Sequence, residues 1–521
     1  MKNLEIANNW SNLPKNIILN IGKYLNDYYR PSIKLINKHW STSVNPLLFY
    51  SIKKFQKNNL EFIIGNCTKF IKFLDNNGAG SLDIIRRISK KTDKIEVLRW
   101  WSGTEECLTV LIELLIKCRG IKSLLLTDCE FDDDETGHNL NWDALIEVIN
   151  SHPSLEALDI CTRCTYLLPL FSNLPQTSIK QLVLYADSDQ VESCMKVINS
   201  SKKLKHLEIT VTNPEYPEDF SDTTALANPS ELLLNNNLEY LSVWIYYYYY
   251  TETAQFKVQL ANEFFNIFQN PNFSSLKSFN WHFWFPSFIL ETDLFNEPIA
   301  LRTPIWTKLT KLSLFAVDKF LMSYIIEHCP NLCELTFNSP MVLPYNHDSN
   351  TLQPLKHLKK LLFGGFKVEL KESFQVIRYL FPNVTTLSLY DISAISDSVV
   401  LDGYYIPLLF PNLRRVIFET EDCNLDSLID YWKDELHWEE LFISLDSSNQ
   451  SLLKPLLKVL PKLSILYLFS SSLDINLDKL GLEPSNLRIF SASASIIMGF
   501  GIRISKELEF SEKKVARRLS V

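Results

Sequence analysis

Apolar residues along most of the chain recur with one spacing, L-x-x-L-x-L, in which Ile, Val, Phe or Trp replaces Leu in the weaker copies. Fifteen such blocks lie between Ile95 and Ala492, and nine of their fourteen intervals are 23 to 26 residues. Their first apolar residues, each numbered position 1, are Ile95, Ile121, Leu155, Ile179, Leu204, Leu238, Leu276, Leu309, Leu332, Leu358, Val384, Leu413, Trp438, Leu463 and Leu487. A repeat of this length predicts a solenoid, in which each repeat packs only on its neighbours.

Positions 4 and 6 of each block alternate with other residues, which is typical of a short strand with one buried face. Between blocks the apolar spacing is helical, as in Leu108, Leu111, Ile112 and Leu115. Strands and helices that alternate without hairpin turns predict an α/β fold. We therefore expect parallel strands on a concave face and helices on a convex face.

Prolines mark the same phase. Each of five prolines stands two residues before position 1, where it is expected to end the preceding helix, because proline cannot continue one. They are Pro153, Pro330, Pro382, Pro411 and Pro461.

Over roughly residues 95–495 the chain resembles the leucine-rich-repeat family. The resemblance is closest at Cys118–Ile121–Leu124–Leu126–Cys129, which is similar to the cysteine-containing subtype, and at Cys329–Leu332–Leu335. The Asn or Cys usual at position 9 is mostly missing, as at Arg163, so the array is degenerate. The resemblance implies an α/β solenoid of about 15 repeats over residues 95–500.

Residues 1–55 lack this repeat and show helical spacing instead. Leu13-Pro14 opens an apolar series that continues through Tyr24, and a second series runs from Ile33 to Trp40. Pro14 suits the first turn of a helix. The segment resembles an F-box in Leu13-Pro14 and in Ile33-Lys34-Leu35-Ile36-Asn37-Lys38-His39-Trp40, although Lys15 and Asn16 stand where that family often has an acidic residue.

The resemblance implies a small all-α domain of about three helices that binds a Skp-type adaptor and, through it, a cullin and a RING subunit. The residues expected to contact the adaptor are Leu13, Pro14, Ile17, Ile18, Ile21, Leu25, Ile33 and Ile36. The alternative is a cap that shields the first repeat, which every solenoid needs. We expect residues 56–94 to form a helical linker or N-terminal cap, and residues 501–521 to form a C-terminal cap or tail.

Positions 5 and 7 point away from the predicted core and line the expected concave face. Large aromatic residues there favour a protein-binding surface. The residues predicted to bind a protein substrate are Trp101, Tyr185, Trp244, His282, Phe315, Tyr390, Phe442, Tyr467 and Phe469. Packing against neighbouring strands or a folded-over loop is the alternative interpretation for each, and the Tyr246–Tyr250 run reads as either an aromatic contact patch or a tolerated insertion.

Composition removes several other classes of function. A formal charge of −8 argues against general nucleic-acid binding. No stretch has the length and hydrophobicity of a membrane span, and Met1–Asn12 lacks an apolar signal core. Ten scattered cysteines are typical of reduced thiols, so we expect a cytoplasmic or nuclear protein. The sequence contains no phosphate-binding or catalytic motif and no metal-ligand spacing, so we expect no enzyme activity, cofactor or metal.

These patterns lead to one hypothesis and two alternatives. The hypothesis is a non-catalytic substrate receptor of a cullin-RING (SCF-type) ubiquitin ligase, with the F-box holding the ligase and the solenoid holding an unknown target protein. The first alternative is a leucine-rich-repeat scaffold or inhibitor with no link to ubiquitin. The second is a regulator of a small GTPase, for which the sequence offers no candidate orienting residue.

Overall fold

The structure is a computed structural model, and it describes the helices and strands of the repeat region with the turns that join them. The described residues are 51–52, 73–76, 82–90, 93–101, 105–127, 142–160, 179–187, 191–212, 238–246, 271–284, 306–315, 317, 319–337, 352–364, 370–389, 405–418, 429, 436–444, 453–470 and 488–493. The chain divides into two compact units: unit 1 comprises Met1–Leu238 and Ser242–Tyr248, and unit 2 comprises Glu239–Leu241 and Tyr249–Val521.

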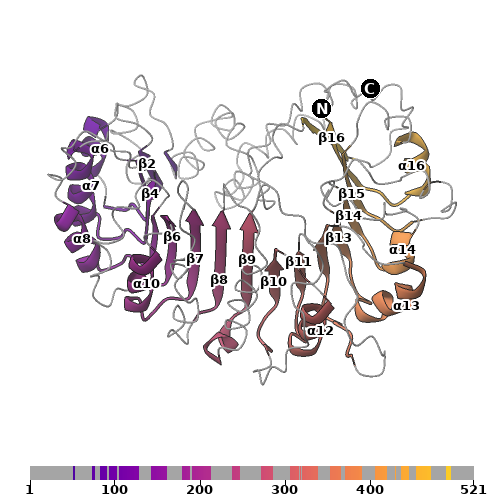
Figure 1. Ribbon diagram of the computed structural model, residues 1–521. Helices are drawn as coiled ribbons and strands as arrows, with labels where there is room; N and C mark the ends of the chain where they lie inside the picture. The colour runs from indigo at the N-terminus through magenta and orange to yellow at the C-terminus, as the bar shows by residue number, and fades with distance from the viewer. Residues whose placement is uncertain are drawn as a thin grey trace, which may run out of the picture. The chain divides into compact units, whose positions relative to one another are not determined.

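Unit 1 is a parallel sheet, and helices alternate with its strands along the chain (Figure 1). Strands β1 to β7 pair in chain order, each parallel to the next. They are β1 (Ser51–Ile52), β2 (Phe73–Asn76), β3 (Val97–Trp101), β4 (Ser123–Thr127), β5 (Ala157–Ile160), β6 (Gln181–Asp187) and β7 (His206–Thr212). Strand β8 (Tyr240–Tyr246) follows, and its residues from Ser242 belong to unit 1. The helices are α6 (Leu82–Ser89), α7 (Glu105–Lys117), α8 (Trp142–Ser151) and α10 (Val191–Ser200).

Unit 2 repeats this plan, and its strands β9 to β17 also pair parallel in chain order. They are β9 (Ser278–Trp284), β10 (Lys311–Leu314), β11 (Glu334–Phe337), β12 (Lys360–Phe363), β13 (Thr386–Leu389), β14 (Arg415–Phe418), β15 (Glu440–Ser444), β16 (Ile465–Ser470) and β17 (Arg488–Ser493). A 3-10 helix, η10 (Pro271–Ser275), precedes β9. The α-helices are α12 (Lys319–His328), α13 (Leu370–Leu380), α14 (Tyr405–Leu409) and α16 (Leu453–Val459).

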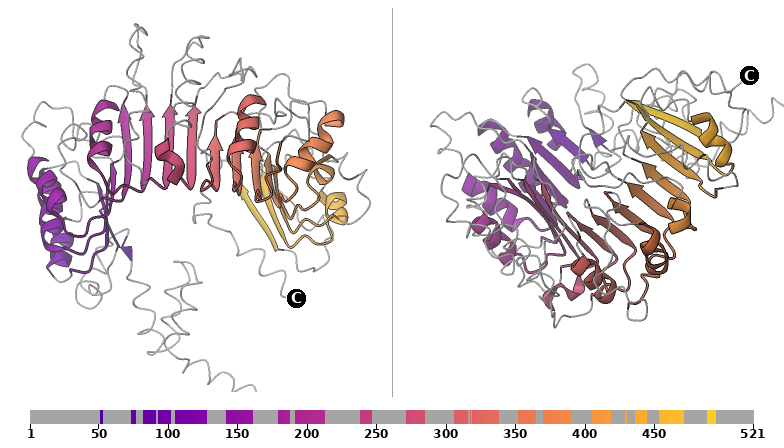
Figure 2. Two further views of the ribbon diagram at one scale, coloured as in Figure 1. Left: turned by 90° about the horizontal axis from the view of Figure 1, so that it is seen from below. Right: turned by 45° about the vertical axis from the view of Figure 1, so that its right-hand side comes forward.

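The predicted α/β repeat architecture is confirmed within each unit. All fifteen L-x-x-L-x-L blocks fall on strands, β3 to β17 in order. Helices lie along one face of the strands in each unit, as the views in Figure 2 show. The predicted F-box helices lie outside the described residues.

Positions 4 and 6 supply the core. In β4, Leu124 and Leu126 are 0% and 1% exposed, and α7 covers this region with six buried side chains that include Leu111 and Leu115. Each large apolar side chain buried in this way contributes about 1.5–3 kcal/mol. Helix α7 contacts both α6 and α8. Each repeat is therefore stabilised by its two neighbours.

One backbone pattern fixes the register of successive repeats. The N–H groups of Lys122 and Ser123, at positions 2 and 3, both donate to the carbonyl of Glu96, at position 2 of the preceding repeat, at 2.7 and 3.1 Å. Unit 2 has the same pair of bonds from Arg414 and Arg415 to Thr385 O, at 2.9 and 3.0 Å. Because this carbonyl accepts from two donors, a shift of register would break both hydrogen bonds at once.

A third buried column was not predicted. In many repeats the N–H of position 1 donates to the carbonyl three residues earlier, as from Ile121 to Cys118 at 3.1 Å. The described residues three places before position 1 are buried, and we name them the helix-end column. They are Cys118, His152, Ser201, Phe273, Trp306, Cys329, Leu355, Phe381, Phe410 and Leu460. Its members differ in polarity and size, which explains why hydrophobic spacing does not reveal it.

The five phased prolines behave as predicted. Each stands two residues after the last residue of a helix, at the ends of α8, α12, α13, α14 and α16. In three cases the next residue is an asparagine whose Nδ2 donates to a backbone carbonyl of the preceding repeat: Asn331 to Thr307 O at 2.8 Å, Asn383 to Lys356 O at 2.9 Å, and Asn412 to Pro382 O at 2.9 Å. We name these the asparagine ladder.

The array begins earlier than the spacing predicts. Strands β1 and β2 extend the sheet of unit 1 into residues 1–55 and 56–94, which were expected to be an F-box and a helical linker. Ile52 and Leu74 stand at position 4 by register, but position 6 is Lys54 and Asn76, so the apolar pattern is incomplete. Helix α6 does lie in the expected helical linker.

At the other end, β17 is shifted by one residue. Leu466 is paired with Ile489, so position 4 of the last repeat is Ile489 rather than the expected Phe490. The segment Leu487–Ser493 has apolar residues in both phases, and a shift of one residue in a strand exchanges its two faces. The spacing alone therefore could not choose between them.

Candidate protein-binding surface

The sheet face that carries positions 5 and 7 is the candidate site, and we name it the odd-position face. In unit 1 the fifth positions along β3 to β7 are Arg99, Leu125, Asp159, Val183 and Glu208. Arg99 is exposed and the other four side chains are half-buried. The fifth positions of unit 1 are therefore accessible from β3 to β7.

Aromatic residues of the odd-position face gather on β6 and β8 of unit 1. The side chains of Tyr185, Trp244 and Tyr246 are all half-buried. The rings of Trp244 and Tyr246 stack with centroids 6.4 Å apart and planes 14° apart. Trp244 Nε1 also donates to Ser242 Oγ at 3.0 Å, and Ser242 is itself 1% exposed. The indole is thus held by a hydrogen bond at its edge and by a ring at its side.

A carboxylate lies on the strand between those of Tyr185 and Trp244. Glu208 is at position 5 of β7, the strand between β6 and β8, and its Oε1 lies 2.9 Å from His206 Nε2. The side chains of Glu208 and His206 are 28% and 29% exposed. An imidazole this close to a carboxylate helps to fix the orientation of the carboxylate.

In unit 2 the odd-position face begins with polar residues. Asn280, Ser313 and Thr336 stand side by side at position 5 of β9, β10 and β11, and all are half-buried. Asn280 Nδ2 donates to the hydroxyl of Tyr240 at 3.1 Å. His282 Nε2 lies 2.7 Å from Ser313 Oγ, and burial lowers the pKa of His282 from 6.5 to about 4. His282 is therefore neutral near pH 7.

From β12 to β15 the fifth positions of unit 2 are closed to solvent. Leu362, Ser388, Ile417 and Phe442 are 5%, 0%, 5% and 6% exposed. The ring of Phe442 stacks on Tyr467 with centroids 4.0 Å apart, and the Arg415 guanidinium lies 4.6 Å from its centroid. These side chains belong to the core of unit 2 rather than to its surface.

The residues predicted to bind substrate therefore divide into four groups. Tyr185, Trp244, Phe315 and Tyr467 are half-buried and accessible. His282 and Phe442 are 7% and 6% exposed, so the expectation that they are open to a partner is wrong: Ser313 engages the first, and Tyr467 and Arg415 cover the second. Trp101 and Phe469 lie on β3 and β16, but their side chains are outside the described residues.

Tyr390 lies outside the described residues altogether, as do all eight residues predicted to contact the adaptor: Leu13, Pro14, Ile17, Ile18, Ile21, Leu25, Ile33 and Ile36. Sequence reasoning missed Asp159 and Glu208 because it weighed aromatic residues at position 7. The signal was present in the sequence, since both occupy position 5 of recognisable blocks.

Ion pairs line the sheet edge where strands begin. At position 2, Lys122 pairs with Glu96 at 3.4 Å and Lys180 with Glu156 at 2.6 Å. The hydrogen bond and charge of Lys180 lower the pKa of Glu156. In unit 2, Lys311 pairs with Glu334 at 3.1 Å. Pairs as exposed as these contribute little to stability, because water and salt screen their charges.

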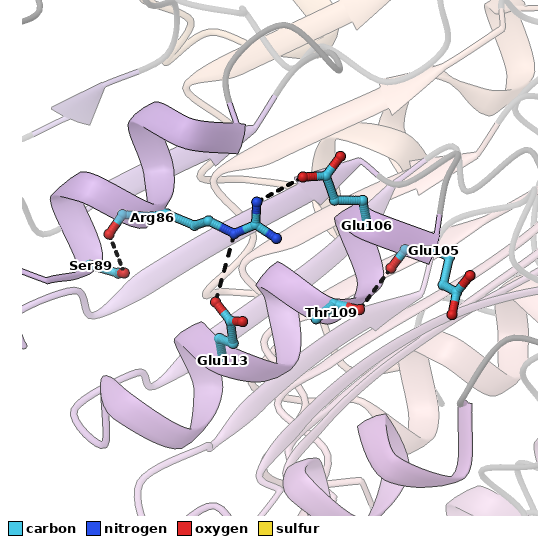
Figure 3. Close-up of polar contacts among 6 residues, drawn as sticks. All are labelled: Arg86, Ser89, Glu105, Glu106, Thr109 and Glu113. Atoms are coloured by element: carbon cyan, nitrogen blue, oxygen red, sulfur yellow. Dashed lines mark hydrogen bonds and ion pairs between the residues drawn. The ribbon is translucent and has the colours of Figure 1, made fainter.

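The helices of unit 1 carry a further charge cluster (Figure 3). Arg86 on α6 reaches α7, where its Nη1 lies 2.7 Å from Glu106 Oε1 and its Nε lies 3.9 Å from Glu113 Oε2. Thr109 Oγ1 donates to Glu105 O at 3.0 Å within α7. These contacts join neighbouring helices, which is a structural role.

Three buried thiols of the repeats stay protonated at neutral pH. Burial raises the pKa of Cys118 to about 11 and that of Cys194 and Cys329 to about 12. Cys118 and Cys329 are 0% exposed and belong to the helix-end column, which gives them a packing role. Within the described ranges, no group of three or more His, Cys, Asp or Glu side chains is arranged to hold a metal ion.

Among the helices that the structure describes, none combines the length and apolar character needed to cross a membrane. Neither a protein-family model nor a curated protein sequence matches this chain. The odd-position face is therefore the feature on which a function can be argued.

Proposed function

We propose that this protein is the substrate receptor of a cullin-RING ubiquitin ligase. The observation that supports the binding half is the accessible row of side chains on the odd-position face of unit 1, with Tyr185, Trp244 and Glu208 at its centre. Large aromatic side chains on a solvated sheet face are typical of protein interfaces. The receptor itself performs no chemistry in this proposal; it holds a target in the geometry that a ubiquitin-charged enzyme needs.

The ligase half of the proposal rests on the resemblance of residues 1–55 to an F-box. Leu13, Pro14, Ile17, Ile21 and Leu25 would form the contact with a Skp-type adaptor, since a domain this small buries little apolar surface alone.

A scaffold without a ubiquitin link is the second candidate, and one observation favours it. Strand β1 lies within residues 1–55 and pairs with β2, so the array begins inside the range that the F-box resemblance covers. A segment directly before the first strand is well placed by sequence to cap it.

The test is co-expression of the full-length chain with a Skp-type adaptor, followed by purification and calorimetry. The proposal predicts a one-to-one complex that the double substitution Ile21→Asp and Leu25→Asp abolishes. The matched control is Asn20→Asp with Asn26→Asp, which adds the same charge at neighbouring polar positions and should leave binding intact. Equal binding by both variants, or no complex with the unmodified chain, would leave the scaffold as the better account.

A further inference from the structure

The odd-position face of unit 1 over β5 to β8 combines aromatic rings with negative charge. Its described side chains at positions 5, 7 and 9 include two carboxylates and three large aromatics but no lysine or arginine. They are Asp159, Val183, Tyr185, Glu208, Thr210, Thr212, Ser242, Trp244 and Tyr246. We name this set the acidic-aromatic face. The positive residues nearby in sequence, such as Lys180 and Lys205, stand at position 2, where the strands begin.

The register brings the two kinds of side chain together. Val183 is paired with Glu208 and Tyr185 with Thr210, and β8 is the hydrogen-bonded neighbour of β7 on its other side. Trp244 occupies the same repeat position on β8 as Tyr185 on β6. Glu208 therefore lies on the strand between those of the two rings, two residues before their level.

This arrangement suits a cation. A lysine or arginine side chain gains about 0.5–2 kcal/mol from an aromatic face, and a neighbouring basic residue of the same segment can form a charge-assisted hydrogen bond with a carboxylate two residues along the strands. The stacking of Trp244 on Tyr246 and its bond to Ser242 hold the indole in place before a ligand arrives, which lowers the entropic cost of binding.

We propose that the acidic-aromatic face binds a segment of a partner protein that carries lysine or arginine. The inference rests on the proposed function, of which it names the kind of target. Charge complementarity selects this occupant, because the chain carries a formal charge of −8 and an acidic surface attracts basic partners and speeds their association.

The same charge complementarity sets the two units apart. On the same face of unit 2, position 3 carries Lys311, Lys360 and Arg415 with Glu334 and Glu440, and the fifth positions from β12 to β15 are closed. A basic segment therefore prefers unit 1.

The experiment uses the full-length chain and a fluorescein-labelled peptide made of alternating Gly-Lys and Ser-Arg pairs, measured by fluorescence anisotropy. Glu208→Gln and, separately, Trp244→Leu should each weaken binding about threefold or more. Glu147→Gln, which removes the same charge from an exposed site on α8, should leave the affinity within about 1.5-fold, because screened distant charges contribute little. Thermal unfolding of each variant shows whether it is folded, and Tyr185→Leu replaces Trp244→Leu if the latter is not.

Equal losses in Glu208→Gln and Glu147→Gln would overturn the inference, because binding would then report overall charge alone. Equal binding of a peptide with glutamate in place of lysine and arginine would overturn it as well. Failure here is distinguishable from failure of the proposed function, since the adaptor test reports on residues 1–55. A complex with the adaptor and no peptide binding would keep the receptor and remove its preference for a basic target.

Discussion

Five strands of unit 1 and four strands of unit 2 use the same repeat position in opposite ways. The fifth positions of unit 1 remain half-exposed or exposed from β3 to β7, whereas those of unit 2 are buried from β12 to β15. Leu125 and Leu362 are the same residue at the same position, yet one is half-buried and the other is 5% exposed. A repeat position thus specifies the direction of a side chain, while its neighbours in other repeats decide whether it meets solvent.

The largest effect is expected when the same substitution, Leu to Ala at position 5, is made in both units. Leu362→Ala removes a buried side chain and should lower the free energy of unfolding by about 3 kcal/mol, whereas Leu125→Ala should cost about 1 kcal/mol or less. Urea unfolding followed by circular dichroism measures both. Similar losses would mean that the two faces are equally closed.

The second test is acidification, which should weaken unit 2 through His282. Its pKa in the folded chain, about 4, lies below 6.5, so the unfolded chain takes up the proton first. The stabilisation is complete above pH 6.5 and is lost as the pH falls toward 4, by up to about 3 kcal/mol. His282→Gln should flatten the pH dependence of unfolding in this window, while His357→Gln, at an exposed site, should not. An unchanged slope in His282→Gln would contradict this role.

The third test concerns the asparagine ladder of unit 2. Asn412→Ala removes the hydrogen bond to Pro382 O and should cost about 1 kcal/mol in unfolding free energy, because the carbonyl keeps some access to water. The comparison variant is Asn383→Ala, where the bond of the same type to Lys356 O is lost. A loss below about 0.3 kcal/mol in both variants would show that water replaces the asparagine fully.

The smallest effect is expected from the ion pairs where the strands begin. A double-mutant cycle of Lys180→Met and Glu156→Gln should give a coupling energy close to the error of the measurement, and 1 M salt should reduce it further. A clearly resolved coupling energy that persists in 1 M salt would assign these pairs a larger part in holding unit 1 together than their exposure suggests.

Much of the fold could be predicted because burial requires apolar residues at regular positions and proline cannot lie inside a helix. Leu124 and Leu126 must be apolar, and Pro330 must follow a helix rather than lie inside it. Strands β1 and β2 escaped detection because Lys54 and Asn76 occupy position 6.

The candidate site was predicted less well. That positions 5 and 7 share a face follows from strand geometry, and Tyr185 and Trp244 are accessible as expected. The burial of Phe442 depends on Tyr467 and Arg415, which lie in other repeats, so no pattern within its own block could reveal it. The acidic character of the unit 1 face likewise emerges only when strands are aligned.

The paired bonds to the carbonyl at position 2 also determine where this chain can change length. Intervals between repeats range from 23 to 38 residues. In the five repeats that have a phased proline, the length from that proline to position 6 is constant. An insertion after the strand leaves both donors and their carbonyl in place, so ten added residues are tolerated there. A single residue inserted between the proline and the strand would separate them. Repeat arrays of this kind can therefore diversify their loops over evolution while the short segment around each strand start stays fixed in length.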